Sequence, residues 1–263
     1  MYIAIPGIKA LHDVVDWAVH IGDIKKGNTR YQDYCTQEVF NSRKDLFAKM
    51  EPNYKKNGND GVDFLLLVGD NEWNECVPYE KTKQLWRDTF ATSNPFNDFD
   101  RTLPYGGDSV SIERQSGTPE NYYFYYDNFQ LAFFGITEPS GDIDHDSINA
   151  NWISQKMTNL IETTGQLPRA MVLAGHSGMS GEVLSVLEDY RSIPTLYVNG
   201  NSHAYDFECI DGFPNIVELT VEAFDLAPML VTLAQNDDDD VLFHVQRLGD
   251  LCCASPNKCF GTR

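Results

Sequence analysis

The chain has 263 residues, and its 39 acidic residues against 20 lysines and arginines give a net charge of −19 at pH 7. This balance argues against binding to a nucleic-acid backbone, because that contact needs clustered basic side chains. The longest apolar stretches are too short to span a bilayer, and residues 1–20 lack the basic segment and cleavage site of a signal peptide. We find no linker or internal repeat, so we expect a single domain over residues 1–263.

Apolar, β-branched runs predict buried strands, and the other segments are assigned from their spacing and turn residues. In the first half, strands are expected to alternate with helices. In chain order we expect the end of a helix at 8–14, a strand at 15–21, a loop at 22–28, helical structure at 42–56, a strand at 62–68, a surface helix at 78–90 and a long loop at 93–117. The last assignment rests on the many Asn, Asp, Pro and Gly residues in that segment.

The second half ends in consecutive strands that have no helices between them. We expect a hairpin of strands at 122–126 and 130–136, a helix at 148–164, a strand at 171–174, a helix at 181–190, a strand at 195–198 and late strands at 216–221, 229–234 and 241–248. Alternating elements followed by consecutive strands predict two sheets packed face to face in an α/β sandwich.

Four of the predicted strands are each followed by a short segment that carries a carboxylate or an imidazole. The segments are His20-Ile21-Gly22-Asp23, Gly69-Asp70-Asn71-Glu72-Trp73, Gly175-His176 and Gly200-Asn201-Ser202-His203. Open α/β sheets place their sites at the carboxyl ends of strands, so we expect Asp23, Asp70, His176 and His203 to converge. Carboxylates and imidazoles together bind transition metals, and two such ions can neutralise a phosphoryl group and generate hydroxide near neutral pH.

These segments, in this order, resemble the calcineurin-like metallophosphoesterases over most of the chain, from about residue 10 to 248. The resemblance implies an α/β fold, a four-layer α/β/β/α sandwich of two mixed sheets flanked by helices. It also implies one or two divalent or trivalent ions of the Fe, Zn or Mn class. Asp23 is then the bridging ligand, and Asp70, His176 and His203 are further metal ligands. The implied reaction is attack by metal-activated water on a small-molecule or macromolecular phosphate ester.

The chain departs from the family pattern at three places. Asn71 stands where the family has a His that contacts the leaving group, and an amide can bind phosphate but cannot deliver a proton. Asn201 replaces the first His of the family's Gly-His-x-His motif. We expect both amides to face the substrate. The Asp-x-His of the family's opening strand does not occur in this sequence, so we expect that strand to be missing and the activity to be weak or lost.

Two other functions remain open from the sequence. One is a metallophosphoesterase fold that binds a ligand or partner without turnover. The other is a serine hydrolase in which Ser177 acts with His203 and an Asp, although the nucleophile elbow requires a Gly where Met179 stands. His20 is expected to pack in the core rather than to bind a metal.

The chain has six cysteines, at positions 35, 76, 209, 252, 253 and 259. Cys35 and Cys76 each follow a motif loop, which favours a disulfide between them near the site. The remaining cluster resembles a disulfide-stapled tail at 249–263 more than a zinc site, because it has no Cys-x-x-Cys pair. Disulfides persist in oxidising compartments, so we expect an extracellular or secretory location.

Overall fold

The computed structural model describes residues 17–25, 34–48, 63–91, 102–105, 108–138, 143–221, 229–235 and 241–247. The predicted helix end at 8–14 and the predicted cysteine-rich tail at 249–263 lie outside these residues.

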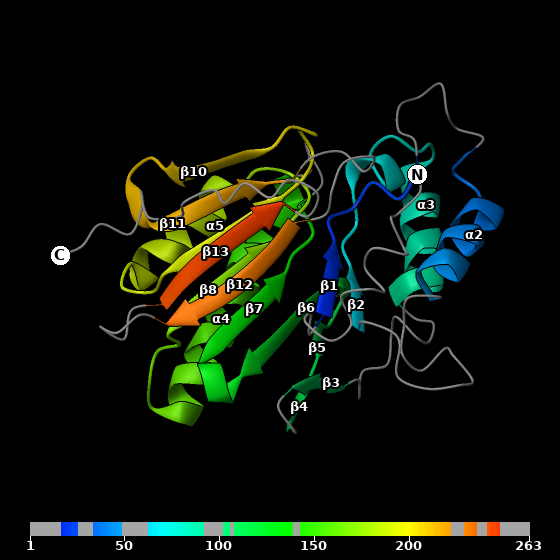
Figure 1. The fold of residues 1–263 in the computed structure, drawn as a ribbon. Coiled ribbons are helices and arrows are strands. Elements are labelled where there is room, and N and C mark those ends of the chain that lie inside the picture. The colour runs from blue at the N-terminus through cyan, green and yellow to red at the C-terminus, as the bar shows by residue number, and fades with distance from the viewer. Residues whose placement is uncertain are drawn as a thin grey trace.

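A seven-stranded mixed sheet forms the centre of the described structure (Figure 1). Its strand order is β10-β11-β9-β8-β7-β6-β5. The strands are β5 (Glu113–Gln115), β6 (Thr118–Tyr126), β7 (Leu131–Gly135), β8 (Ala170–Ala174), β9 (Thr195–Asn199), β10 (Asp206–Ile210) and β11 (Phe213–Thr220). β7, β8, β9 and β11 are parallel to one another, whereas β6 and β10 run antiparallel to their neighbours. The predicted hairpin of β6 and β7 is confirmed.

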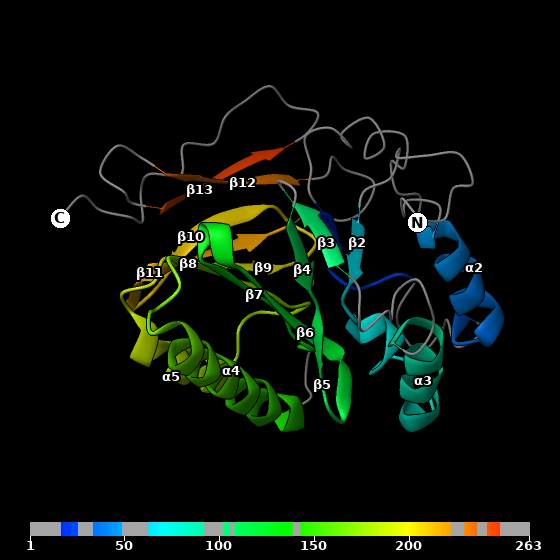
Figure 2. The same cartoon turned by 90° about the horizontal axis from the view of Figure 1, so that it is seen from below.

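Two helices cover one face of this sheet (Figure 2), α4 (Ile143–Thr164) and α5 (Gly181–Leu187). The apolar side of α4 presents Ile153 and Met157, four residues apart, to Phe134 and Leu173 of the sheet. All four side chains are fully buried. This burial of apolar surface positions the helices against the sheet.

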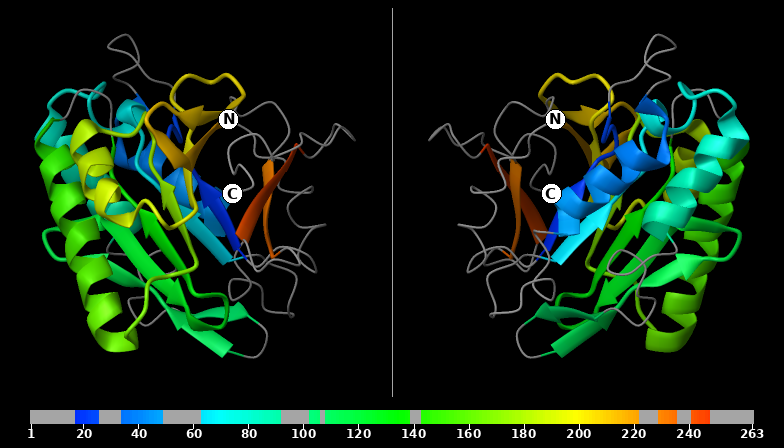
Figure 3. Two further views of the ribbon diagram at one scale, coloured as in Figure 1. Left: turned by 90° about the vertical axis from the view of Figure 1, so that its left-hand side faces the viewer. Right: turned by 90° about the vertical axis from the view of Figure 1, so that its right-hand side faces the viewer.

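The opposite face of the sheet is covered by further strands (Figure 3). β1 (Trp17–His20) pairs parallel with β2 (Asp63–Leu66), and β12 (Met229–Gln235) pairs antiparallel with β13 (Val241–Arg247). Leu65, Leu67 and Phe243 belong to one buried cluster with Phe124 and Phe133 of the central sheet. The main core therefore lies between two layers of strands.

A second pair of helices packs on the outer side of β1 and β2. They are α2 (Gln37–Ala48) and α3 (Tyr79–Trp86), and α3 continues into a π-helical turn at Arg87–Ala91. Along β2 the side chains alternate: Leu65 faces the central sheet, whereas Leu66 packs with Phe47 and Trp86 of the helices. The layers thus follow the order helix, sheet, strands, helix, which confirms the predicted α/β sandwich.

Some predictions about individual elements were wrong. Segment 93–117 was expected to be a loop, but it contains β3 (Thr102–Tyr105), β4 (Asp108–Ser111) and β5. The edge strand β10 was not predicted, because its side chains are mostly exposed and show no apolar run. Within the described residues the second layer is built of separate two-stranded sheets, β1-β2 and β12-β13, rather than one mixed sheet.

Candidate metal centre

Asp23 and Asp70 follow two neighbouring parallel strands, β1 and β2, so their loops lie side by side. Gly22 and Asp23 both adopt positive φ angles, 74° and 56°, which turn the chain sharply after β1. For a non-glycine residue this conformation is uncommon and marks a constrained site. Asp70 begins a short 3-10 helix, Asp70–Glu72, directly after Gly69.

His176 and His203 follow β8 and β9, which are also parallel neighbours but belong to the central sheet. The backbone of Gly200 and Asn201 donates to the carbonyl of His176, which ties the two loops together. His203 has a positive φ of 56°, like Asp23. The site therefore takes its carboxylates from one layer and its imidazoles from the other.

The two aspartates meet at His176. Its Nε2 atom lies 3.3 Å from Asp23 Oδ1 and 3.4 Å from Asp70 Oδ1. The candidate ligand atoms of these three residues all lie within 4.8 Å of one another. His203 lies on the other side of Asp23, with its Nε2 atom 3.2 Å from Asp23 Oδ2, and its side chain is half exposed. Asp23 thus contacts both imidazoles, one through each oxygen.

The protonation of His176 fits a metal ligand. Its Nδ1 atom lies 2.8 Å from the carbonyl oxygen of Ile21, and because a carbonyl only accepts, Nδ1 carries the proton. In the neutral ring, the Nε2 lone pair then faces two carboxylate oxygens. Three acceptors that converge in this way can hold a cation. A histidine held through its other nitrogen by a backbone carbonyl is the usual arrangement at metal sites.

In the metal-free protein, these acceptors can hold a proton instead. Burial by itself would lower the pKa of His176, but the hydrogen bond to Asp70 and the charge of Asp23 outweigh it and raise the pKa to about 9. Burial also raises the pKa of Asp23, against the opposing charge of His176. Both pKa values are raised for the same reason, because carboxyl groups are concentrated at a partly buried site.

The two amides expected to face the substrate both take part in hydrogen bonds. Asn71 donates from its side chain to the carbonyl of Lys25 at 3.1 Å and from its backbone to Asp23 Oδ1 at 3.3 Å. Asn201 donates from its side chain to Ser177 Oγ at 3.4 Å. Both residues therefore stand beside the ligand loops, and their contact with a substrate stays a prediction.

The serine-hydrolase arrangement is not assembled. Ser177 Oγ accepts its hydrogen bond from Asn201, and His203 Nε2 faces Asp23. Among the described residues, therefore, no histidine is hydrogen-bonded to Ser177 as a base. His20, which was expected to pack, is buried beside the ring of Phe47 at 5.3 Å between centroids, as predicted.

The site contains one residue that the sequence analysis did not assign, Glu72. Its side chain is completely buried and accepts hydrogen bonds from the backbone of Asp23, Lys25 and Gly69. Burial, followed by the nearby charge of Asp23, raises its pKa to about 8. Its signal in the sequence is the spacing Gly69-x-x-Glu72, in which a glutamate reaches back to the residue that precedes a helical turn.

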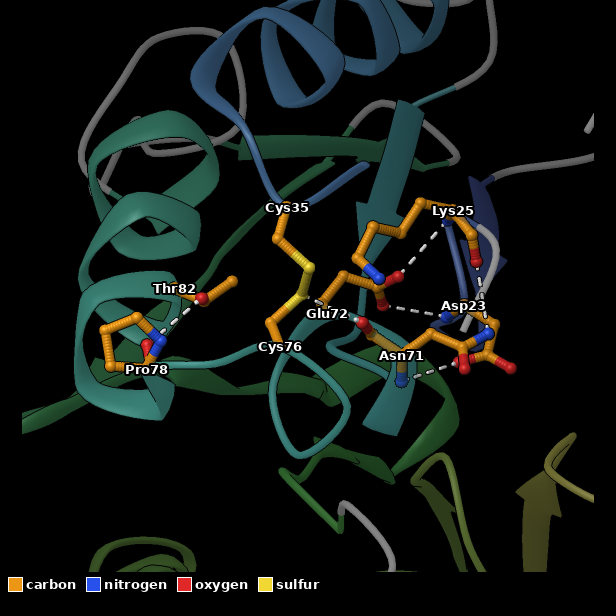
Figure 4. Close-up of a disulfide and its surroundings, with 8 residues drawn as sticks. All are labelled: Asp23, Lys25, Cys35, Asn71, Glu72, Cys76, Pro78 and Thr82. Carbon is orange, nitrogen blue, oxygen red and sulfur yellow. Dashed lines mark hydrogen bonds between the residues drawn. A yellow bond between two sulfur atoms is a disulfide. The ribbon is translucent and has the colours of Figure 1, made fainter. Parts of the chain in front are cut away.

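A disulfide lies next to this loop. Cys35, just before α2, is bonded to Cys76, which follows the Asp70–Glu72 turn (Figure 4). The sulfur of Cys76 also lies 3.5 Å from the carbonyl oxygen of Asn71. The predicted bridge between Cys35 and Cys76 is confirmed. Cys209 in β10 is disulfide-bonded as well.

Comparison with known proteins gives structural likenesses but no match in sequence. No protein-family model matches the chain, and no curated protein matches its sequence. The fold is similar to the crystal structure of a 5'-nucleotidase from Candida albicans SC5314, with a TM-score of 0.48 and 13% sequence identity. The similarity covers 86% of this chain and 41% of the nucleotidase, so this chain spans less than half the length of that protein. None of the described helices combines the length and hydropathy needed to cross a bilayer.

Proposed function

We propose that the chain is a metal-dependent phosphoesterase that hydrolyses a phosphate ester with metal-activated water. The observation that carries the proposal is the convergence of Asp23, Asp70 and the Nε2 atom of His176, whose proton is held on the other nitrogen by Ile21. Mixed carboxylate and imidazole ligands suit ions of the Fe, Zn or Mn class. His203 is the proposed ligand of a second ion, because it contacts the second oxygen of Asp23.

The chain's own residues define what each part of the site does. Asp23 stands between the two imidazoles, so it is the proposed bridging ligand. When bound, the ions would neutralise phosphoryl oxygens and lower the pKa of a water molecule. The amides of Asn71 and Asn201 are proposed to orient the phosphate. Neither can donate a proton to the leaving group, so we expect slow turnover of esters with poor leaving groups.

The experiment measures metal content and phosphatase activity of the purified protein beside two variants. Asp23→Asn removes a ligand charge from the centre of the site, whereas Ser177→Ala leaves all four proposed ligands in place. We expect one or two bound ions in the wild type and in Ser177→Ala, and a loss of metal in Asp23→Asn. Activity that survives a chelator, or that depends on Ser177, would contradict the proposal.

The second candidate is a protein that uses the same fold and site to bind a phosphorylated ligand without turnover. The presence of amides at Asn71 and Asn201 favours it, because each replaces an imidazole of the family pattern. Stoichiometric metal, together with saturable binding of a phosphate ester that is recovered intact, would identify this function. Release of inorganic phosphate in proportion to enzyme concentration would exclude it.

The proposed setting is an oxidising compartment, extracellular or secretory. The disulfide between Cys35 and Cys76 supports it, since such bonds are rare where thiols are kept reduced. The proposed partners are small-molecule or macromolecular phosphate esters rather than nucleic-acid backbones, because the net charge is −19. Bound cations are needed to overcome that charge locally.

A further inference from the structure

Glu72 connects the two loops that carry the aspartates. Its Oε2 atom accepts the backbone N–H groups of Gly69 and Asp23, each at 2.9 Å, and its Oε1 atom accepts that of Lys25 at 3.2 Å. Asp23 and Lys25 belong to the loop after β1, whereas Gly69 ends the segment after β2. The side chain of Glu72 therefore links its own loop to the loop after β1. The backbone groups that it binds there lie 47 and 49 residues away in sequence.

This connection occurs where the backbones are already in close contact. A Cβ atom on Gly69 would lie 2.2 Å from the backbone nitrogen of Asp23 and 2.9 Å from Glu72 Oε2. Asp23 itself has a φ of 56°, a conformation that a non-glycine residue keeps only when its surroundings hold it. The hydrogen bond from the Asp23 N–H to Glu72 is an interaction that holds it.

The Lys25 side chain lies beside the buried carboxyl group of Glu72 and partly opposes the rise in its pKa. Figure 4 shows the Lys25 side chain bent back, with its ammonium group toward the carboxyl group of Glu72. Lys25 is itself buried, with 4% of its surface exposed. The two polar groups are thus enclosed together, and both carboxyl oxygens of Glu72 accept backbone N–H groups.

We propose that Glu72 is the positioning residue of the site, which fixes Asp23 relative to Asp70 before any ion binds. It does so through the backbone, by holding the Asp23 turn against the Gly69–Asp70 turn. Both of its carboxyl oxygens accept backbone N–H groups, and it is not one of the three residues whose ligand atoms converge, so we assign it no ligand role. The part of this inference that concerns metal affinity rests on the proposed function, whereas the part that concerns loop order does not.

The deciding comparison is Glu72→Gln against Glu75→Gln. The first variant keeps the size of the side chain but replaces one acceptor oxygen with an NH2 group, which cannot accept a backbone N–H. The second makes the same chemical change in the same loop and leaves the three hydrogen bonds to Glu72 in place. Effects common to both variants report the loss of a carboxyl group from this loop, and effects found only in Glu72→Gln report positioning.

The first measurement is amide hydrogen exchange by NMR in protein treated with a chelator. We expect one of the amides of Asp23 and Lys25, the one that faces the new NH2 group, to exchange about 10- to 100-fold faster in Glu72→Gln than in the wild type, because its buried acceptor is lost. Both amides should exchange at wild-type rates in Glu75→Gln. Wild-type exchange in a folded Glu72→Gln protein would overturn the inference, whatever the metal does.

The second measurement is Mn²⁺ affinity by titration calorimetry. We expect Glu72→Gln to bind about 10- to 100-fold more weakly than Glu75→Gln, the usual cost of losing a group that orients a ligand. Equal affinities in the two variants would overturn the inference. If the wild type binds no Mn²⁺, Zn²⁺ or Fe²⁺, the proposed function fails, and the exchange measurement still decides the role of Glu72.

Glu72→Asp is the second variant, for use if Glu72→Gln does not fold. It keeps the carboxyl group but draws it back by one methylene group, away from the donors of the other loop. Faster exchange at Asp23 in this variant supports the positioning role. Unchanged exchange shows that the loop does not depend on the reach of this carboxyl group and overturns the inference.

Discussion

Gly22 and Gly69 lie against each other through their backbones: a Cβ atom on Gly22 would be 2.6 Å from the Cα atom of Gly69. The same added atom would lie 2.8 Å from Nδ1 of His176. Real Cβ atoms do not approach other atoms so closely, so neither turn has room for a side chain. The two Gly-Asp pairs of the sequence therefore have a steric meaning, because each glycine lets its aspartate reach the shared centre.

We predict that Gly69→Ala destabilises the protein and weakens metal binding together. The added methyl group would overlap the backbone of Asp23, and overpacking of this kind costs about 1–3 kcal/mol of unfolding free energy. Urea denaturation followed by circular dichroism measures it. Gly178→Ala is the matched control, since a Cβ there meets nothing within 4 Å, and its change should stay within about 0.5 kcal/mol. Equal stability of the two variants would contradict the steric argument.

We predict a steep dependence of the rate on the leaving group, because the proposed site lacks a proton donor at Asn71. An aryl ester such as p-nitrophenyl phosphate leaves without a proton, whereas an alkyl phosphate needs one. Asn71→His should raise the rate with the alkyl phosphate by at least about tenfold, since general acid catalysis typically contributes about 10²–10⁴-fold. Asn71→Ala is the control for loss of the hydrogen bond to Lys25. A rate in Asn71→His no higher than in the wild type would argue against this explanation.

We predict that removing the disulfide destabilises the fold and loosens the Asn71 loop. The bridge joins residues 41 positions apart, and disulfides of this kind typically contribute about 2–4 kcal/mol. The double variant Cys35→Ser, Cys76→Ser is preferable to a reducing agent, because Cys209 is disulfide-bonded as well. Its unfolding free energy should fall by about that amount in urea. Stability equal to that of the wild type would mean that packing around α2 and α3 is sufficient by itself.

We predict that Glu138 makes stability fall with rising pH in the metal-free protein. Burial, followed by the nearby charge of Asp146, raises the pKa of Glu138 from 4.5 to about 8. The folded state therefore favours the neutral carboxyl, so its contribution is complete below about pH 4.5 and is lost as the pH rises through about 8. Glu138→Gln should flatten this part of the stability profile.

The measurement for Glu138 is a series of urea transitions between pH 5 and pH 9 in the presence of a chelator. Glu182→Gln, an exposed substitution in the first turn of α5, is the control and should leave the profile unchanged. Gln can still accept the hydrogen bond that Asn149 donates to Glu138 at 3.3 Å. A profile with the same slope in Glu138→Gln and the wild type would show that other groups dominate.

The sequence predicted the buried strands well because their apolar runs leave few alternatives. β8 and β9 were placed to within one residue at each end, and the helices between the central strands followed from their spacing. The strands of segment 93–117 escaped prediction, because β5 is half exposed and glycines and prolines surround it. Such strands are stabilised by their neighbours in the sheet rather than by a local pattern.

The residues of the candidate site likewise divide into those that a local sequence pattern indicates and those that only the folded structure shows. The convergence of Asp23, Asp70 and His176, with His203 beside Asp23, could be predicted because each residue follows a strand and parallel strands bring their carboxyl ends together. That these residues bind a metal stays a prediction. The role of Glu72 was missed because its partners in the other loop are the backbone N–H groups of Asp23 and Lys25. Every sequence has such groups, so nothing in the sequence indicates these contacts. Only the folded backbone shows that these donors lie within reach of one carboxylate.

The division of the candidate ligands between layers has a thermodynamic consequence. Asp23 and Asp70 follow strands of the β1-β2 layer, and His176 and His203 follow strands of the central sheet. An ion bound by both pairs would therefore add a link between two layers that meet through an apolar cluster and through the hydrogen bond between His176 and Ile21. By linkage, an ion present at 100 times its dissociation constant would add about 2.7 kcal/mol to the unfolding free energy. The melting temperature of this protein would then rise with the concentration of free metal ion around it.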